Sequence, residues 1–538
     1  MRQPCVVRQP RRPPDQILCR ALILTFAVFL VIYSVRTWDM VSGIALTPAA
    51  IAFIGLRMAI EVLAAAYGIA FALNAGAYLM CDHSAPLESA SATPSIGLIY
   101  LCCDDADARA VKSLATLTYP GPVHLVIHDD SATPAGQALI ADLAGEMSAK
   151  TSFSVHLLRR PDRNGGKAAA VNYALARTAH LFEFFLLCDN DSTVVDPLMI
   201  RKALHRIGDS NVAVVQFRPL AIVTPNICGV NRLLSRSITA FHAFLLPCSR
   251  FGWMPFIGHN ALLRTQAVLG VGGLTPGFFS DDLDLTVRLN LAGYDVVYAP
   301  DIVMGETHPP SYAAFRRRSY KWAYGCMQTL KAHTWPVLRS SRFTLAEKIS
   351  FLQFGGFYAL QAVLVVYLMF AFVIGPFLLL GSDVVDVPGS VIAGGIVVLL
   401  VYLPVLAYVI KEGCCDSAWF AALLLCGLVY GGTDFSVARG VWDGAWGRTR
   451  RWTPTNAKAR ERRTATLFAE AAFGVMLLAG PLMTLPAVLY LPCSYLFAGK
   501  FLFGPALSLL YQDEKSEHEP WVSPDLSDPR RSVLRVGS

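Results

Sequence analysis

Charged residues are scarce in this sequence. Asp, Glu, Lys and Arg make up 16% of its 538 residues, whereas hydrophobic residues make up 54%. Because a soluble protein carries about 25% charged residues, this composition excludes an ordinary soluble chain. The apolar excess is concentrated before residue 81 and after residue 349. The block between them has the composition of one soluble domain, and its roughly 260 residues are enough for a sizeable core.

Several motifs are also missing. The thirteen cysteines form no CxxC spacing, and Cys102-Cys103 and Cys414-Cys415 are adjacent pairs that suit no local bridge. We therefore expect free thiols in a reducing compartment. There is no P-loop and no zinc-finger spacing, and the net charge of +7 is modest. The basic residues cluster near apolar spans, which favours a lipid bilayer over nucleic acid as the partner.

Six apolar segments are predicted to cross a bilayer, for which about 20 helical residues are needed. Arg57 and Glu61 lie one helical turn apart in the second of them, so we expect them to pair, or Arg57 to reach the nearer interface. The six segments are Ile17–Val35, Thr47–Met80, Phe351–Leu380, Val391–Ile410, Leu467–Leu482 and Leu485–Leu510.

The basic residues also predict the topology. The N-terminal arm and the arginine-rich segment 439–463 should both be cytoplasmic, which places the middle domain inside as well. The short apolar piece Ser417–Tyr430 must then lie in the interface or re-enter. The N-terminus has no evident cleavage site and is interpreted as a retained anchor. We expect a multi-pass protein of a bacterial-type inner (plasma) membrane.

The expected organisation has six parts. Residues 1–83 hold an N-terminal arm and two transmembrane helices, 84–349 a cytoplasmic catalytic domain, 350–411 two transmembrane helices, 412–465 an interfacial helix and a basic loop, 466–511 two transmembrane helices, and 512–538 a disordered tail.

Within the middle domain, apolar runs alternate with helical stretches, which predicts an α/β domain with a mostly parallel sheet. The expected strands are Ile96–Cys102, Val123–His128, Ser154–Leu158, Phe184–Cys188 and Val212–Phe217. The expected helices are Val111–Thr118, Gly136–Met147, Ala168–Thr178 and Leu198–Ile207.

Two acidic clusters follow expected strands. Asp189 and Asp191 come directly after a buried run, at the sheet edge where ligands collect in α/β folds. Two carboxylates one residue apart can share a divalent cation with phosphate oxygens. Asp129 and Asp130 end an earlier strand and can accept hydrogen bonds from a base or ribose. A helix cap or Asx turn is the alternative for this second pair.

Basic residues are placed to hold phosphate. Lys167 follows Gly165-Gly166 at the start of an expected helix, where the backbone can approach an anion; a solvated loop is the alternative. Arg318, Lys321 and Trp322 share one face of a later helix. Its cations can hold a diphosphate and its indole can support a sugar ring. An amphipathic interfacial helix is the alternative here.

A third acidic cluster, Asp281, Asp282 and Asp284, opens the helix that runs through Arg288. A partly buried carboxylate among other carboxylates has its pKa raised, which suits a base that deprotonates a sugar hydroxyl. Simple compensation of the helix dipole is the alternative.

Taken in order, these motifs resemble the membrane-embedded family 2 glycosyltransferases, which include cellulose, chitin and hyaluronan synthases. The resemblance implies a GT-A-like α/β cytoplasmic domain inserted between transmembrane segments. It also implies a UDP-sugar donor, Mg²⁺ or Mn²⁺, and inverting transfer to a glycan acceptor. By the same resemblance Asp129 and Asp130 hold the nucleoside. Asp189 and Asp191 serve the diphosphate and metal, and Asp282 is the base.

Two further patches are similar to bacterial osmoregulated and cyclic β-glucan synthases. They are Gly258–Ala261, which implies acceptor binding by His259 and Asn260, and Glu306–Ser311. A structural role is the alternative for His259. Trp452–Lys458 loosely resembles the gating loop of cellulose synthases. The usual Gln-x-x-Arg-Trp is replaced by Arg318-x-x-Lys321-Trp322, and Lys lacks the fork of Arg, which leaves acceptor choice and processivity open.

The sequence therefore favours a membrane glycosyltransferase that extends a β-glucan-like polysaccharide and couples synthesis to export, with room for partner subunits. Within the enzymes, the alternative is a non-processive transferase that acts on a lipid acceptor. From another class, the alternative is a transporter or receptor with a degenerate transferase domain. Loss of the ordered carboxylates would favour that last reading, and they are present.

Overall fold

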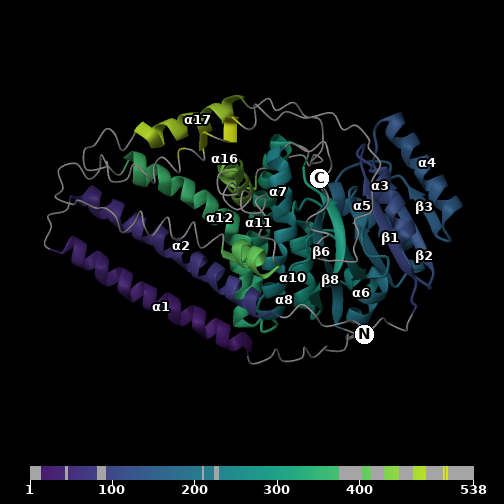
Figure 1. Cartoon of the computed structure of the whole chain (residues 1–538), viewed down its shortest axis with the longest axis horizontal. Helices are drawn as coiled ribbons and strands as arrows, with labels where there is room; N and C mark the ends of the chain where they lie inside the picture. Colours follow the sequence, from purple (N-terminus) through teal and green to yellow (C-terminus); the bar gives the residue numbers. More distant parts are fainter. Residues whose placement is uncertain are drawn as a thin grey trace.

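The chain forms an α/β domain with a group of long helices beside it (Figure 1). The structure is a computed structural model that describes residues 14–42, 47–81, 93–208, 211–222, 229–309, 311–374, 403–412, 429–447, 464–479, 498, 501–502 and 504–506. Most of Val391–Ile410 and Leu485–Leu510, nearly all of Ser417–Tyr430, the loop Trp452–Lys458 and the tail lie outside these residues.

The α/β domain is built on one eight-stranded sheet in the order β3-β2-β1-β4-β7-β6-β8-β5. The strands are β1 (Ile96–Cys102), β2 (Val123–Asp129), β3 (Ser154–Leu158), β4 (Phe184–Cys188), β5 (Thr193–Val194), β6 (Val212–Ile222), β7 (Ala261–Arg264) and β8 (Asp295–Thr307). All five expected strands are confirmed, although β6 runs five residues past Phe217, to Ile222.

The sheet is mixed, whereas the sequence predicted a mostly parallel one. β1 to β4 form one parallel ladder, and β6 pairs with β8 in a second. β7 lies antiparallel between β4 and β6, and β5 lies antiparallel to β8. β7 has four residues and β5 has two, so neither is long enough to show a strand pattern in the sequence.

Helices cover both faces of the sheet. One face packs against α3 (Ala108–Ser113), α4 (Pro134–Lys150) and α6 (Met199–Ile207). The other packs against α5 (Gly166–Thr178), α8 (His242–Phe251), α9 (Thr265–Gly270) and α10 (Asp281–Ala292). The expected helices are confirmed in α4, α5 and α6. The fourth begins three residues earlier than expected and ends in a 3-10 turn, Leu114–Thr116.

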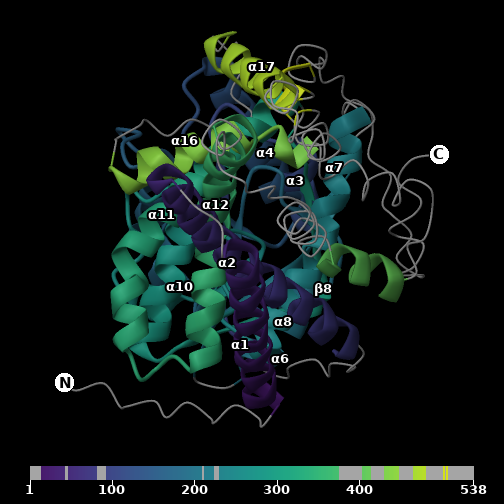
Figure 2. The ribbon, with the colours of Figure 1, turned by 90° about the vertical axis from the view of Figure 1, so that its left-hand side faces the viewer.

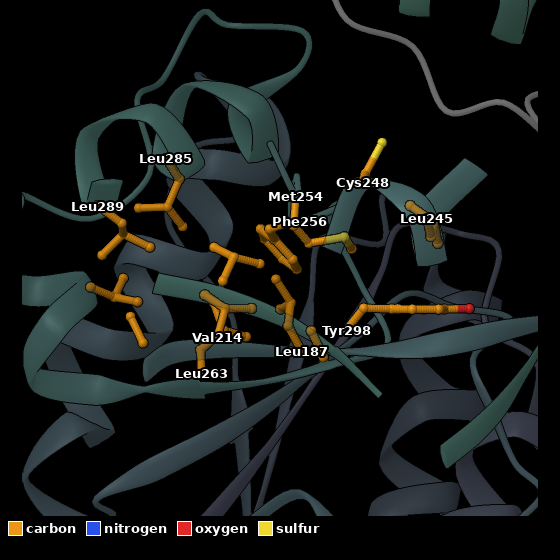
Figure 3. Packing of buried hydrophobic residues seen from close by; sticks show 14 of the residues in the cluster. Leu187, Val214, Leu245, Cys248, Met254, Phe256, Leu263, Leu285, Leu289 and Tyr298 are labelled. Carbon is orange, nitrogen blue, oxygen red and sulfur yellow. The ribbon is translucent and has the colours of Figure 1, made fainter. Parts of the chain in front are cut away.

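Buried apolar side chains pack between the sheet and α10 (Figure 3). Leu187, Val214 and Leu263 point up from three strands, and Leu285 and Leu289 point down from α10. All five side chains are buried, and burial of a leucine side chain contributes about 1.5–3 kcal/mol. This packing fixes α10, so that its N-terminal carboxylates sit at the edge of the sheet.

The long helices α1 (Pro14–Val41), α2 (Pro48–Met80) and α12 (Leu345–Met369) lie side by side at one end of the molecule (Figures 1 and 2). In the described part of the chain, α2 and α12 are long and apolar enough to cross a membrane by length and composition. Shorter apolar helical stretches span Ile23–Val35 in α1 and Leu467–Ala479 in α17 (Thr464–Ala479). Arg57 Nε contacts Glu61 Oε1 at 2.8 Å, as expected for a pair one turn apart.

Helix α11 (Tyr312–Arg339) connects the two parts. It packs against α10, α12 and α16 (Asp434–Ala445). The contact with α16 is close: a Cβ at Gly440 would lie 2.5 Å from the Tyr320 carbonyl oxygen. Arg316 of α11 is buried and forms an ion pair with Glu470 of α17, which is equally buried. α11 is therefore held by its sequence neighbours α10 and α12 and by the more distant helices α16 and α17.

Candidate functional site

The site begins at the carboxyl end of β4. Asp189 follows this strand, and its Oδ1 accepts a hydrogen bond from Lys167 Nζ at 2.5 Å. Lys167 stands at the start of α5, behind Gly165 and Gly166, which both have positive φ. A side chain is strained in that conformation, so the two glycines allow the turn that brings Lys167 to the sheet edge. The sequence predicted Lys167 at a helix N-terminus, and the structure also brings it into contact with the carboxylate that follows β4.

His259 lies on the other side of Asp189. Its Nδ1 is 3.6 Å from Asp189 Oδ2, and its Nε2 is 2.6 Å from Glu306 Oε2. Burial opposes the charged ring, but Asp189 and Glu306 raise its pKa to about 9, so the imidazole is a cation at neutral pH. The sequence placed His259 with the acceptor, whereas the structure brings it against the first carboxylate of the expected metal pair.

Asp191 is fixed by the end of β8. Its Oδ2 accepts hydrogen bonds from the Thr307 backbone N at 2.9 Å and from Thr307 Oγ1 at 2.8 Å. Burial and the neighbouring charge of Glu306 raise the pKa of this carboxyl. The Asp191 carboxylate therefore lies where the negative charge of the neighbouring carboxylates exceeds the positive charge of the nearby cations.

Asp282 stands in the first turn of α10, facing Gly258. A Cβ at Gly258 would lie 3.0 Å from Asp282 Oδ2, a tight contact, and the positive φ of 94° at this position also favours glycine. Burial raises the pKa of Asp282 to about 6, and burial together with the charge of Asp282 raises the pKa of Asp281 to about 7. Lys167 acts on both carboxyls in the opposite direction. Lys167 thus links the two acidic clusters.

The third carboxylate of that cluster, Asp284, has a different position. It accepts hydrogen bonds from Thr275 Oγ1 at 2.6 Å, Arg288 Nε at 2.8 Å and His333 Nε2 at 2.7 Å. His333 belongs to α11, so this carboxylate ties the start of α10 to the helix that carries the basic motif. It holds the other two in place rather than facing them.

Asp129 and Asp130 end β2 as predicted, and both are paired with arginines that follow β3. Asp129 is buried and accepts hydrogen bonds from Arg159 Nε and from the Ser131 backbone N, each at 2.8 Å. Asp130 accepts two from Arg160, whose Nε and Nη2 lie 2.9 Å and 2.5 Å from its oxygens. Asp129 thus serves the loop itself, and Asp130 is the better placed of the two to meet a ligand.

Arg318, Lys321 and Trp322 lie on α11. The Arg318 guanidinium sits over the Trp322 ring, 4.5 Å from its centroid, which confirms that these two share a face. Trp322 is 42% exposed, as a platform for a ligand must be. Burial and the charge of Arg317 lower the pKa of Lys321 to about 8, against the opposing charge of Asp105.

Asn260 is fully buried and adopts a left-handed conformation, with φ of 53°. Its backbone N donates to Leu187 O at 2.8 Å, and its backbone O accepts from Phe217 N at 3.0 Å. Neither polar atom of its side-chain amide has a hydrogen-bond partner among the described residues. The Asn260 backbone therefore bridges β4 and β6 by hydrogen bonds, close to the end of β4 that Asp189 follows.

Sequence reasoning gave no role to two acidic residues of the site. Asp105 follows β1. Burial and the charges of Asp189 and Asp191 raise the pKa of Asp105 to about 6. The charge of Asp105 in turn acts to raise the pKa of Lys321. The Asn190 side chain donates to the Asp105 backbone O at 2.9 Å. Glu306 holds His259. Both stand at strand ends beside noted motifs, and that position was the available signal.

A divalent cation fits this set of groups. Asp105, Asp189, Asp191, Asp281, Asp282 and Glu306 gather around Lys167 and His259, and the pKa values of four of these carboxyls are raised. Hard oxygen ligands in excess suit Mg²⁺ or Mn²⁺. Among the described residues, no group of three or more His, Cys, Asp or Glu is arranged to enclose a metal by itself. The donor's phosphates would therefore have to complete the coordination.

Comparison with known sequences agrees with this geometry. Residues 184–433 match the family described as "Glycosyl transferase family group 2". This part of the chain is a glycosyltransferase family 2 domain. The matched residues run from β4 past the basic motif of α11, and the mixed α/β sheet around them is GT-A-like.

Two curated relatives of this family 2 domain come from plants. The chain is 24% identical over 245 residues to "Probable glucomannan 4-beta-mannosyltransferase 2" of Oryza sativa subsp. japonica, covering 44% of this chain and 42% of the relative. It is 26% identical over 269 residues to "Probable glucomannan 4-beta-mannosyltransferase 1" of Arabidopsis thaliana, covering 49% and 48%. The chain thus spans less than half the length of these two relatives.

A solved structure is similar at low identity. It is titled "Mannosyltransferase PcManGT from Pyrobaculum calidifontis in complex with GDP-Man and Mn2+". The likeness covers 74% of this chain and 100% of that one, with 16% identity and a TM-score of 0.46.

Proposed function

We propose that the protein transfers a hexose from a nucleotide-diphosphate sugar to the growing end of a β-linked glycan, with inversion. The observation that carries the proposal is the convergence of Lys167, Asp189 and Asp191 with Asp282 at one sheet edge. Lys167 acts electrostatically on both Asp189 and Asp282. The groups that would bind the donor's phosphates therefore lie next to the carboxylate that would deprotonate the acceptor hydroxyl.

The phosphate side of the reaction follows from charge. Asp189 and Asp191 would hold Mg²⁺ or Mn²⁺, which supplies charge neutralisation to the departing nucleoside diphosphate. Lys167 and Arg318 bring fixed positive charge to the same group, and Lys321 adds a cation that titrates near neutrality. Asp130 would accept hydrogen bonds from the base or ribose, with Arg160 orienting its carboxylate.

The acceptor side centres on Asp282. With its pKa raised to about 6, this carboxylate is ionised at neutral pH yet basic enough to take a proton from a sugar hydroxyl as that oxygen attacks the anomeric carbon. Gly258 leaves room beside it. Trp322 offers the acceptor ring a half-exposed apolar surface, which Arg318 keeps in place from the preceding turn.

The polymer is the finer part of the proposal. The sequence favoured a β-glucan, whereas the similarity to proteins named as glucomannan 4-beta-mannosyltransferases favours a β-mannan backbone. We therefore put mannose first and glucose second as the transferred sugar.

The bilayer is the expected setting of the protein. α1 exposes large apolar side chains along its length, among them Leu24 at 67% and Val31 at 64%, and solvent exposure of so much apolar surface is unfavourable.

Radiolabelled GDP-mannose and UDP-glucose, each supplied with Mn²⁺ or Mg²⁺ to the purified full-length protein in detergent, test the proposal. We expect one donor to be consumed and a product that β-mannanase or β-glucanase digests. A labelled lipid that resists both enzymes would overturn the polymer proposal in favour of a lipid acceptor. If the protein consumed none of these donors and none of a wider panel of nucleotide sugars, the transferase proposal would be overturned.

A further inference from the structure

A pair of histidines lies away from the site, near the start of β2 and in the middle of β3. His124 of β2 and His156 of β3 face each other, with His124 Nδ1 and His156 Nε2 3.4 Å apart. Their rings are stacked, with centroids 5.6 Å apart and an angle of 28° between planes. Val126 is the direct partner of His156 in the ladder, so the two histidines are diagonal neighbours on one face of the sheet.

We propose that His124 and His156 form a chelating site for a transition-metal ion of the Zn²⁺, Ni²⁺ or Cu²⁺ class. Two imidazole nitrogens at about 2.0–2.1 Å from a tetrahedral metal lie roughly 3.3 Å apart. The observed 3.4 Å between the facing nitrogens has the same bite. Imidazole suits these ions, whereas carboxylate oxygens suit Mg²⁺ and Mn²⁺. The chain would thus bind two metals by different chemistry at separate places.

The protonation states favour binding. Burial lowers the pKa of both rings, and the nearby charge of His180 lowers them further. Both imidazoles are therefore neutral at physiological pH. Each can carry its single proton on the nitrogen that faces away, which leaves the two facing nitrogens bare. Metal binding at this pair then needs a change of tautomer in at most one ring and no net release of a proton.

The position gives the site a consequence. β3 is the edge strand of the sheet, and both side chains are half-buried, so solvent can supply the remaining ligands. A metal bridging His124 and His156 would join β3 to β2. The same two strands lead to Asp129 and Asp130 and to the arginines that pair with them. Occupancy would brace the edge on which the nucleoside side of the site is built.

Metal binding by tag-free protein tests this inference. The full-length protein in detergent is treated with a chelator, freed of it, and titrated with Ni²⁺ and Zn²⁺ by calorimetry, with thermal unfolding followed in parallel. His124→Ala and His156→Ala should each lower Ni²⁺ affinity by at least roughly tenfold, the lower end of what losing an outer partner of a metal ligand costs. Both should abolish the rise in melting temperature that Ni²⁺ gives the parent. His205→Ala, an exposed histidine on α6, should change neither.

A second variant separates this site from the carboxylates. The double variant Asp189→Ala/Asp191→Ala should retain the Ni²⁺ affinity and the stabilisation, even if it loses all transferase activity. Ni²⁺ binding that disappears with the aspartates and survives in His156→Ala would overturn the proposal. So would Ni²⁺ binding that is equal in the parent and in the two histidine variants.

Discussion

At the scale of single residues, function in this molecule depends on how carboxylates are distributed among partners. Asp129 and Asp284 are each surrounded by donors and serve the structure. Asp282 and Asp191 lie among other acids. Burial raises the pKa of both carboxyls, and the charge of neighbouring acids raises the pKa of Asp191 further. The sequence shows all four as members of similar acidic clusters. Their roles diverge only because of which arginine, histidine or threonine the fold brings to each.

Asp282→Asn should lower the rate of transfer on the order of 10²–10⁴-fold, the usual contribution of a general base, with donor affinity largely kept. In the parent the base works only when deprotonated. Because its pKa is raised to about 6, activity should fall as the pH drops through about 6 and level off above neutrality. Initial rates from pH 5 to 8 measure both effects. Asp142→Asn, an exposed change on α4, is the control, and a variant of Asp282 with normal turnover would rule out this base.

Asp191→Ala should abolish the dependence of donor binding on the divalent ion. Without this ligand the diphosphate meets a site dominated by carboxylates, so affinity should fall for the nucleotide with Mn²⁺. Calorimetry with UDP and with GDP, each with and without Mn²⁺, is the measurement. Unchanged affinity in the presence of the ion would show that the metal, if required, binds elsewhere.

The Lys321 series tests the substitution that sets this chain apart from the usual motif. Lys321→Arg should retain most activity, since charge is kept and donors are added. Lys321→Gln should lose far more, because a cation facing a diphosphate in a dry site is removed. Trp322→Ala should shorten the product more than it lowers the initial rate. The measurements are the initial rate and the product length of the three variants. Full activity in Lys321→Gln would show that α11 is an amphipathic helix at the membrane interface and does not bind the diphosphate.

At the scale of elements, the sequence predicted what periodicity and length can reveal. Long apolar runs predicted the central strands, and two of the expected spans coincide with helices long and apolar enough to cross a membrane, α2 and α12. The antiparallel β7 was missed because Ala261–Arg264 is too short to show alternation. The contacts of His259 with Asp189 and Glu306 were also missed, since they join residues 70 and 47 positions apart. Such contacts depend on the order of strands, which no local pattern encodes.

Gly440→Ala should loosen the packing of α16 on α11. The added Cβ would meet the Tyr320 backbone at 2.5 Å, which real contacts do not allow, so the two helices must move apart, and any shift of α11 carries Arg318 and Lys321 with it. We expect lower activity and a lower melting temperature. Gly145→Ala is the matched control, because nothing lies within 4 Å of a Cβ there and alanine favours a helix by about 0.5–1 kcal/mol. Equal behaviour of the two variants would refute this role for α16.

At the scale of the whole molecule, one buried ion pair joins the catalytic domain to the apolar helices. Arg316 and Glu470 lie 154 residues apart, and each is at most 2% exposed. Arg316 Nη1 also donates to the Gly432 carbonyl at 2.8 Å. The pair therefore connects α11, α17 and the segment before α16 at a single point. The helix that carries Arg318 and Lys321 cannot move independently of these neighbours.

Removing one member of this pair should cost about 3–5 kcal/mol, because an uncompensated charge stays buried. Arg316→Met and Glu470→Met should each lower the melting temperature in detergent strongly. The double variant should recover much of the loss, since two apolar side chains of similar length replace the pair. Additive losses in the double variant would mean that the two residues stabilise the protein separately.

The two parallel ladders also have a consequence for how the protein is made. β1 to β4 complete their pairing within residues 96–188, whereas β6 and β8 need residues 212–307. Chains emerge from the ribosome N-terminus first, so the first ladder can form while the second is still being synthesised. β7 then pairs with β4 across more than 70 intervening residues, and such distant pairing is slow. The nascent chain is thus arranged to build the Lys167–Asp189 side first and to gain Asp282, the proposed base, only when the second ladder closes onto the first.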